Sequence, residues 1–182
     1  MSSLHRPSTF ALTLAALCVC SSARADVSSW LFTGGGISLL DLSGNRTAAG
    51  TLHIDAGLGS SPRAPIAVGG IARVAARFGQ GTDLGVYLRL ATRGYNMGDW
   101  GAAVDLGGLH RFWDGDPQGF GGTLSLGAPW GVTLSVDASH ETNGDNTFAT
   151  VLGIDFARLT DYRRTGLSWL ANPFPAPQPE AR

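Results

Sequence analysis

WGVTLSVDASHETN, residues 130–143, alternates between apolar and polar side chains with a period of two. The even positions are Trp130, Val132, Leu134, Val136 and Ala138. The odd positions that interleave with them are Gly131, Thr133, Ser135, Asp137 and Ser139. Successive side chains of a β-strand point to opposite faces of the sheet. The pattern therefore predicts a strand with one apolar and one polar face.

Seven further segments carry an alternation of the same kind. They are residues 30–42, 50–59, 66–78, 83–93, 100–112, 120–128 and 146–159. The first of these is interrupted by three glycines at 34–36 and alternates least regularly. Short polar turns join the segments, and about 9–11 residues are enough for a tilted strand to cross a membrane. The sequence therefore predicts an all-β fold, an eight-stranded antiparallel up-and-down transmembrane barrel.

The two ends of the chain differ in composition from the strand region. Residues 1–25 join a basic start to an apolar run at 10–20 and an Ala-Arg-Ala cleavage site, which is the pattern of a removable secretory signal. Residues 160–182 include a proline-rich run at 172–179. We therefore expect a signal peptide at 1–25, a barrel at 26–159 and a periplasmic tail at 160–182.

Charge and cysteine content argue against several function classes. Both cysteines, Cys18 and Cys20, lie in the predicted signal, so the mature chain would hold neither a disulfide nor a thiolate metal site. Removing Arg6 and Arg24 from the 13 Arg leaves 11 against 14 acidic residues, a formal charge of −3. Nucleic-acid-binding proteins are usually basic. We expect no nucleic-acid partner, no metal and no cofactor.

The charged residues indicate which face of the strands points inward. The chain has no Lys and only two Glu, whereas soluble β-proteins usually carry both on their outer surface. Here Arg and Asp lie on the polar strand faces, among small residues that suit a narrow lumen. Buried charges persist only when they are paired. The predicted lumen charge network is Asp55, Arg73, Arg77, Arg89, Asp105, Arg111, Asp137 and Asp155.

Aromatic residues on the apolar faces gather at the strand ends. They are Trp30, Phe78, Trp100, Phe112, Phe120, Trp130, Phe148 and Phe156. Outer-membrane barrels carry such aromatic girdles at both membrane interfaces. A soluble barrel of the lipocalin kind has the opposite orientation, with apolar side chains inside and a small apolar ligand bound among them. The sequence favours the membrane barrel and leaves the soluble periplasmic barrel as an alternative.

Residues 30–159 resemble the small eight-stranded outer-membrane barrels of the OmpA/OmpX type, and the resemblance is one of architecture. It implies a bacterial outer-membrane location, with outer-membrane lipid and lipopolysaccharide as partners. Such barrels are too narrow for an open pore, and side chains fill them. We therefore expect a closed, salt-bridged lumen and a structural or anchoring role in the cell envelope. Other envelope proteins are candidate partners for the tail.

The predicted outer loops are short. With the N-terminus in the periplasm they fall at about residues 43–49, 79–82, 113–119 and 140–145. Members of this class that act as adhesins or receptors usually display longer loops. The short loops therefore argue against a dedicated ligand-binding surface.

His140, Thr142 and Asn143 form the sharpest catalytic candidate. They resemble the His-x-Ser-Asn motif that the lipid A 3-O-deacylase family carries at the outer end of a strand. The resemblance would make His140 the base of an outer-membrane acyl-ester hydrolase. Thr142 stands where that family has Ser, and the predicted strand at 146–159 has no Glu to orient the base. A polar turn with a histidine at the membrane interface is the simpler interpretation.

Overall fold

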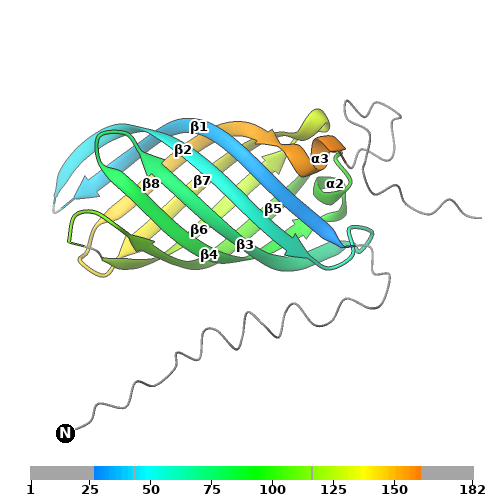
Figure 1. Cartoon of the computed structure of the whole chain (residues 1–182), viewed down its shortest axis with the longest axis horizontal. Helices are drawn as coiled ribbons and strands as arrows, with labels where there is room; N and C mark the ends of the chain where they lie inside the picture. The colour runs from blue at the N-terminus through cyan, green and yellow to red at the C-terminus, as the bar shows by residue number, and fades with distance from the viewer. Residues whose placement is uncertain (1–26, 43, 116, 161–182) are drawn as a thin grey trace, which may run out of the picture.

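The computed structural model describes residues 27–42, 44–115 and 117–160, and these form one closed β-barrel (Figure 1). The predicted signal peptide at 1–25 lies outside the described residues. So does the predicted tail at 160–182, apart from Thr160.

Eight strands make up the wall of the described barrel. They are β1 (Ser28–Leu42), β2 (Asn45–Gly59), β3 (Ile66–Arg77), β4 (Gly81–Thr92), β5 (Gly101–Arg111), β6 (Gln118–Gly127), β7 (Val132–Glu141) and β8 (Asn146–Asp155). Each strand pairs antiparallel with the next in sequence, and β8 closes the barrel by pairing with β1. This order confirms the prediction of an all-β, eight-stranded up-and-down barrel.

The two ends of the barrel are built differently. At the hairpin end, short turns join β1 to β2, β3 to β4, β5 to β6 and β7 to β8. At the helix end, β1 begins, β8 ends, and short helical turns follow three of the strands. These turns are α2 (Arg93–Asn96), η1 (Pro129–Gly131) and α3 (Phe156–Thr160); Figure 1 shows α2 and α3 together at that end.

None of the helices in the described ranges is long and apolar enough to span a membrane.

The apolar strand faces point outward and the polar faces point into the lumen. Val86 is 65% exposed on β4, while Arg89 on the same strand is 1% exposed. On β7, Leu134 and Val136 are exposed, whereas Thr133 and Ser135 are buried. The predicted orientation is confirmed. The alternative of a soluble barrel with an oily interior is wrong, because the Leu and Val side chains that it requires lie outside.

β1 corrects one part of the sequence prediction, because Trp30 faces the lumen and is only 2% exposed. The indole fits there because Gly59 on β2 and Gly69 on β3 have no side chains, and a Cβ at either position would meet the ring. Its Nε1 donates a hydrogen bond to Asn96 Oδ1 at 3.0 Å. Alternation does not reveal this inward position, since both faces of residues 30–42 carry large apolar residues and glycine.

Two predicted strand boundaries at the helix end are also wrong. The alternation predicts that Trp130 opens a strand, but Trp130 lies in η1 with φ 65°, in the left-handed region. The turn is closed by the Ala128 N–H, which donates to the Val132 carbonyl at 2.8 Å, so β7 begins two residues later. The predicted strand at 146–159 ends at Asp155, because α3 turns the chain back toward the barrel and buries Arg158.

The other seven aromatic residues of the predicted girdles are exposed on the outer surface, as expected. Those at or near the hairpin end are Phe78, Phe112, Phe120 and Phe148. Those at the helix end are Trp100, Trp130 and Phe156. Two aromatic belts therefore border the apolar band of the barrel.

Candidate functional site

The middle of the lumen holds five charged side chains that we call the central cluster: Asp55, Arg73, Arg89, Asp105 and Asp137. Asp55 lies directly opposite Arg73 in the β2–β3 pairing, and Arg89 lies opposite Asp105 in the β4–β5 pairing. Directly opposed residues on one face of a sheet are close enough for their side chains to touch. The register of the strands thus positions both ion pairs.

Each of the two arginines forms a bidentate contact with the carboxylate opposite it. Arg73 Nε and Nη2 donate to the two oxygens of Asp55 at 2.8 and 2.7 Å. Arg89 Nε and Nη2 donate to the two oxygens of Asp105 at 2.7 and 2.8 Å. Such bidentate pairs are among the strongest hydrogen bonds between side chains.

Arg73 also connects the pairs to one another and to the far wall. Its Nη2 donates to Asp105 Oδ2 at 3.1 Å, and its Nη1 donates to Asp137 Oδ1 on β7 at 2.5 Å. Thr123 on β6 donates to the same Asp137 oxygen at 2.5 Å and itself accepts from Arg73. The central cluster therefore crosses the lumen from β2 to β7.

A second group, the hairpin-end cluster, fills the lumen near the turns: Arg77, Asp83, Arg111, Glu141 and Asp145. Arg77 pairs with Asp83, and Arg111 Nη2 donates to Glu141 Oε1 at 2.6 Å. Trp113 covers this cluster, with its ring centroid 4.3 Å from the Arg111 guanidinium carbon and its Nε1 donating to Asp83 at 2.8 Å.

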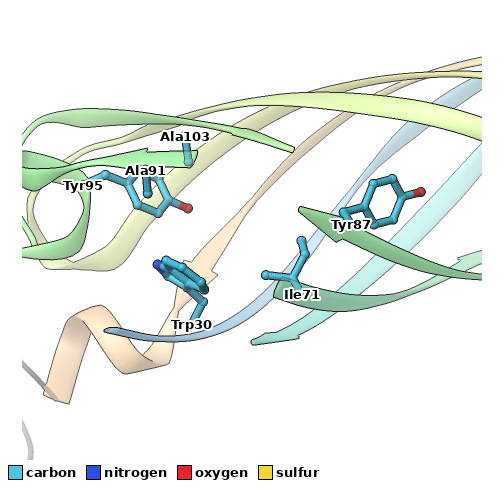
Figure 2. Close-up of a cluster of buried hydrophobic side chains, with 6 residues drawn as sticks. All are labelled: Trp30, Ile71, Tyr87, Ala91, Tyr95 and Ala103. Carbon is cyan, nitrogen blue, oxygen red and sulfur yellow. The ribbon is translucent and has the colours of Figure 1, made fainter. Parts of the chain in front are cut away.

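The helix end is closed by a third group, the helix-end plug: Trp30, Tyr95, Asp155 and Arg158. Arg158 Nη2 donates to the carbonyls of Asp99 and Ala128, at 2.9 and 3.0 Å. Its guanidinium carbon lies 4.5 Å from the ring centroid of Tyr95. Figure 2 shows Trp30 and Tyr95 near Ala91 and Ala103, with Tyr87 and Ile71 further along the barrel. Burial raises the pKa of the Tyr95 phenol.

The structure brings most of the eight predicted lumen charges into these groups. Asp55, Arg73, Arg89, Asp105 and Asp137 form the central cluster, and Arg77 and Arg111 belong to the hairpin-end cluster. Asp155 lies apart from both. Its Oδ1 accepts hydrogen bonds from the backbone N–H groups of Leu31 and Arg158, at 3.3 and 3.2 Å.

Sequence reasoning missed four charged residues of the lumen. Asp83 on β4 and Glu141 on β7 share the parity of inward residues of their strands, so strict counting would have found them. Asp145 is buried just before β8. Arg158 follows the last strand, and only the turn into α3 brings it inside, so alternation carries no signal for it.

The catalytic candidate at the hairpin end does not assemble into a triad. His140 is exposed, and its Nδ1 lies 2.9 Å from Asn146 Oδ1, which is an amide rather than a carboxylate oxygen. The Thr142 N–H donates to the Gln118 carbonyl, and Asn143 donates to Asp145. Glu141 points to the other side of the strand, against Arg111. In the described part of the chain, no carboxylate is hydrogen-bonded to His140.

Within the described ranges, no three His, Cys, Asp or Glu side chains are grouped so that they could hold a metal ion.

Comparisons with known proteins add little to this geometry. No family model and no curated protein sequence matches the chain. Among solved structures, the chain is similar to Ail, the attachment invasion locus protein of Yersinia pestis, in complex with the heparin analogue sucrose octasulfate. The identity is 12% over 71% of this chain and 97% of Ail, with a TM-score of 0.48. The closed barrel itself carries the predicted resemblance to small eight-stranded outer-membrane barrels, as a likeness of architecture.

Proposed function

We propose that this protein is an outer-membrane β-barrel of a Gram-negative bacterium, with a closed lumen and a structural or anchoring role in the cell envelope. The observation that carries the proposal is the outer surface. Between the two aromatic belts, the outward positions of the described strands carry no charged side chain. Outward leucines, valines and isoleucines are exposed on all eight strands.

A lipid environment accounts for this surface better than water does. Soluble monomers rarely expose continuous apolar patches larger than a few hundred Å². A closed barrel is one of the two structures that can cross a bilayer, because all of its backbone groups are paired within the wall. The strands have 10 to 15 residues, and about 9–11 are enough to cross.

The filled lumen favours a structural role over transport. The central cluster spans the interior, and the other two groups close both ends. Eight-stranded barrels are narrow enough for side chains to fill them. We therefore assign no open pore to the protein, and outer-membrane lipid and lipopolysaccharide are its proposed partners.

The proposed orientation is based on the two ends of the barrel. We place the helix end in the periplasm, with the tail at 160–182 available to other envelope proteins. The hairpin end then faces outward with short turns such as 78–80 and 142–145. Such turns offer little area for a receptor or adhesin, which supports an anchoring role.

Cell fractionation combined with gel migration tests the location. The protein should sediment with outer membranes and resist extraction by carbonate. Unheated samples should migrate differently from boiled samples, because a folded barrel resists detergent. Recovery from the periplasm in soluble form without detergent would contradict the proposal.

A deletion strain tests the role. Loss of the protein should increase sensitivity to detergents and leave the acyl chains of lipid A unchanged by mass spectrometry. If the deletion instead changed lipid A acylation, and the wild-type protein but not a His140→Ala variant reversed that change, the result would contradict the structural role and support the hydrolase hypothesis.

A further inference from the structure

The lumen is not packed solid between the central cluster and the hairpin-end cluster. A chamber of about 30 Å³ lies there, lined by His53, Arg73, Arg77, Tyr87 and Asp137 among others. A buried water needs about 10–15 Å³ of such space and two to four polar partners. The chamber has the size and the polarity to hold about two water molecules.

Four of the side chains that line this space carry buried polar atoms without a hydrogen-bond partner, and two of them, Arg77 and Asp83, form an ion pair with each other. His53 on β2 is 3% exposed, and its Nε2 has no partner among the described residues. Asp137 Oδ2 likewise has no hydrogen bond there, and it lies 3.7 Å from His53 Nδ1. The Asp137 side chain, which lines the chamber, keeps 15% of its surface exposed. Buried polar groups are normally paired, so both atoms need a partner that the described residues do not supply.

The net charge of the central cluster is a second observation that bears on this chamber. The central cluster contains two guanidinium groups and three carboxylates. An excess charge in a low-dielectric interior is costly unless something offsets it. The titratable and charged groups that face His53 or share its chamber are Asp137 on β7, Arg73 and Arg77 on β3, Asp83 and Tyr87 on β4, and Asp55 on its own strand. His53 can therefore add positive charge beside the third carboxylate.

We propose that the chamber is a hydrated proton-binding site formed by His53 and Asp137. Water occupies it and hydrogen-bonds to His53 Nε2 and Asp137 Oδ2. On acidification, a hydronium ion in the chamber gives its proton to Nε2 and remains as water, and the imidazolium offsets the third carboxylate of the central cluster. This site goes beyond the structural role and does not depend on which membrane holds the barrel.

Nuclear magnetic resonance of the histidine rings in the folded, detergent-solubilised barrel tests the proposal. After removal of the predicted signal, three histidines remain, His53, His110 and His140, so three ring signals are expected. The His53 ring should titrate as the pH is lowered. Asp137→Asn should lower its titration midpoint by about one unit, since an opposite charge within about 4–6 Å favours the charged form.

A matched control removes a carboxylate that is far from the chamber. Asp41 pairs with Arg46 at the hairpin end, and Asp41→Asn should leave the His53 midpoint unchanged. A His53 ring that does not titrate, or a midpoint that is the same in Asp137→Asn and wild type, would overturn the site.

Water in the chamber is tested in the wild-type protein, so the proposal stays falsifiable even where Asp137→Asn fails to fold. Magnetisation transfer from water to the His53 ring should be detectable. Ala75→Leu, which adds a side chain to the chamber lining, should abolish that transfer. A wild-type ring with no water contact would show a dry chamber and refute the proposal.

Discussion

At the scale of single residues, Arg73 links three other strands across the lumen, because it contacts carboxylates on β2, β5 and β7. Removing one partner of a buried ion pair leaves uncompensated charge and costs about 3–5 kcal/mol. We expect Arg73→Ala to lower the free energy of unfolding by that amount, measured by urea denaturation in lipid vesicles.

Arg46 provides the control for Arg73. Its side chain is 89% exposed, and its contact with Asp41 is 3.5 Å long. Exposed ion pairs contribute about 0–1 kcal/mol, so Arg46→Ala should be close to wild type. Equal losses of unfolding free energy in Arg73→Ala and Arg46→Ala would mean that the buried network stabilises the barrel no more than an exposed ion pair does.

Gly59 is a second residue with a testable role, because a Cβ there would meet the Trp30 ring. Gly59→Ala should cost about 1–3 kcal/mol by overpacking. The cost should shrink in a Trp30→Leu background, where the ring is absent. Gly35→Ala adds a Cβ that meets only the Thr51 carbonyl oxygen at ordinary contact distance, and it should be nearly neutral. Unfolding of all four variants in urea checks the coupling.

Parity along the strands predicted most of the charged residues that the structure places inside. It worked where one face is clearly polar, as at Arg89 and Asp105. It failed at Trp30, because glycines on two neighbouring strands make room for an indole, and glycine spacing across strands cannot be read from one strand. It also failed at Arg158, which reaches the lumen from α3 rather than from a strand.

At the scale of elements, each strand should tolerate a charged residue on its lumen face and at its end, but not on its outer face. Leu88 is exposed in the middle of β4. An arginine on the lipid face at the bilayer midplane costs about 2–4 kcal/mol, so Leu88→Arg should reduce the folded, heat-modifiable fraction. Gln80→Arg, in the turn after β3, should leave that fraction unchanged. A Leu88→Arg variant that folds as well as wild type would contradict lipid contact at this position.

α3 should hold the helix end together through Arg158. Its guanidinium donates to the Asp99 and Ala128 carbonyls, which belong to two different turns. Arg158→Ala should therefore speed backbone hydrogen exchange in residues 94–101 and 128–132, while exchange in β2 and β3 stays at the wild-type rate. If Arg158→Ala changed the exchange rate by the same factor throughout the barrel, Arg158 would not cross-link these turns.

The existence and order of the eight strands could be predicted from sequence, but several of their boundaries could not. At the hairpin end, β2 begins at Asn45, so most of the predicted loop at 43–49 is strand. At the helix end, two predicted boundaries are wrong. Trp130 and Phe156 both continue the apolar parity of their strands, so the pattern runs on where the backbone already turns. The turn at Trp130 requires a left-handed backbone next to Pro129, and α3 requires space in the lumen for Arg158. Both depend on contacts between segments that are distant in sequence.

At the scale of the whole molecule, the barrel inverts the usual arrangement of a soluble protein. Charges lie inside, paired across strands, and leucine, valine and isoleucine cover the outside. The lack of lysine and the placement of Arg and Asp within strands already indicate this inversion. The proposed location, the closed lumen and the anchoring role all depend on the outer face meeting lipid.

Spin labelling of β7 tests that contact most directly. The only cysteines, Cys18 and Cys20, lie in the predicted signal, so single-cysteine variants of the mature barrel should react at one position. Labels at Val132, Leu134 and Val136 in a bilayer should collide often with dissolved oxygen and rarely with a water-soluble nickel chelate. The reverse preference at Leu134, frequent collision with the chelate and little with oxygen, would place this face in water and contradict the account.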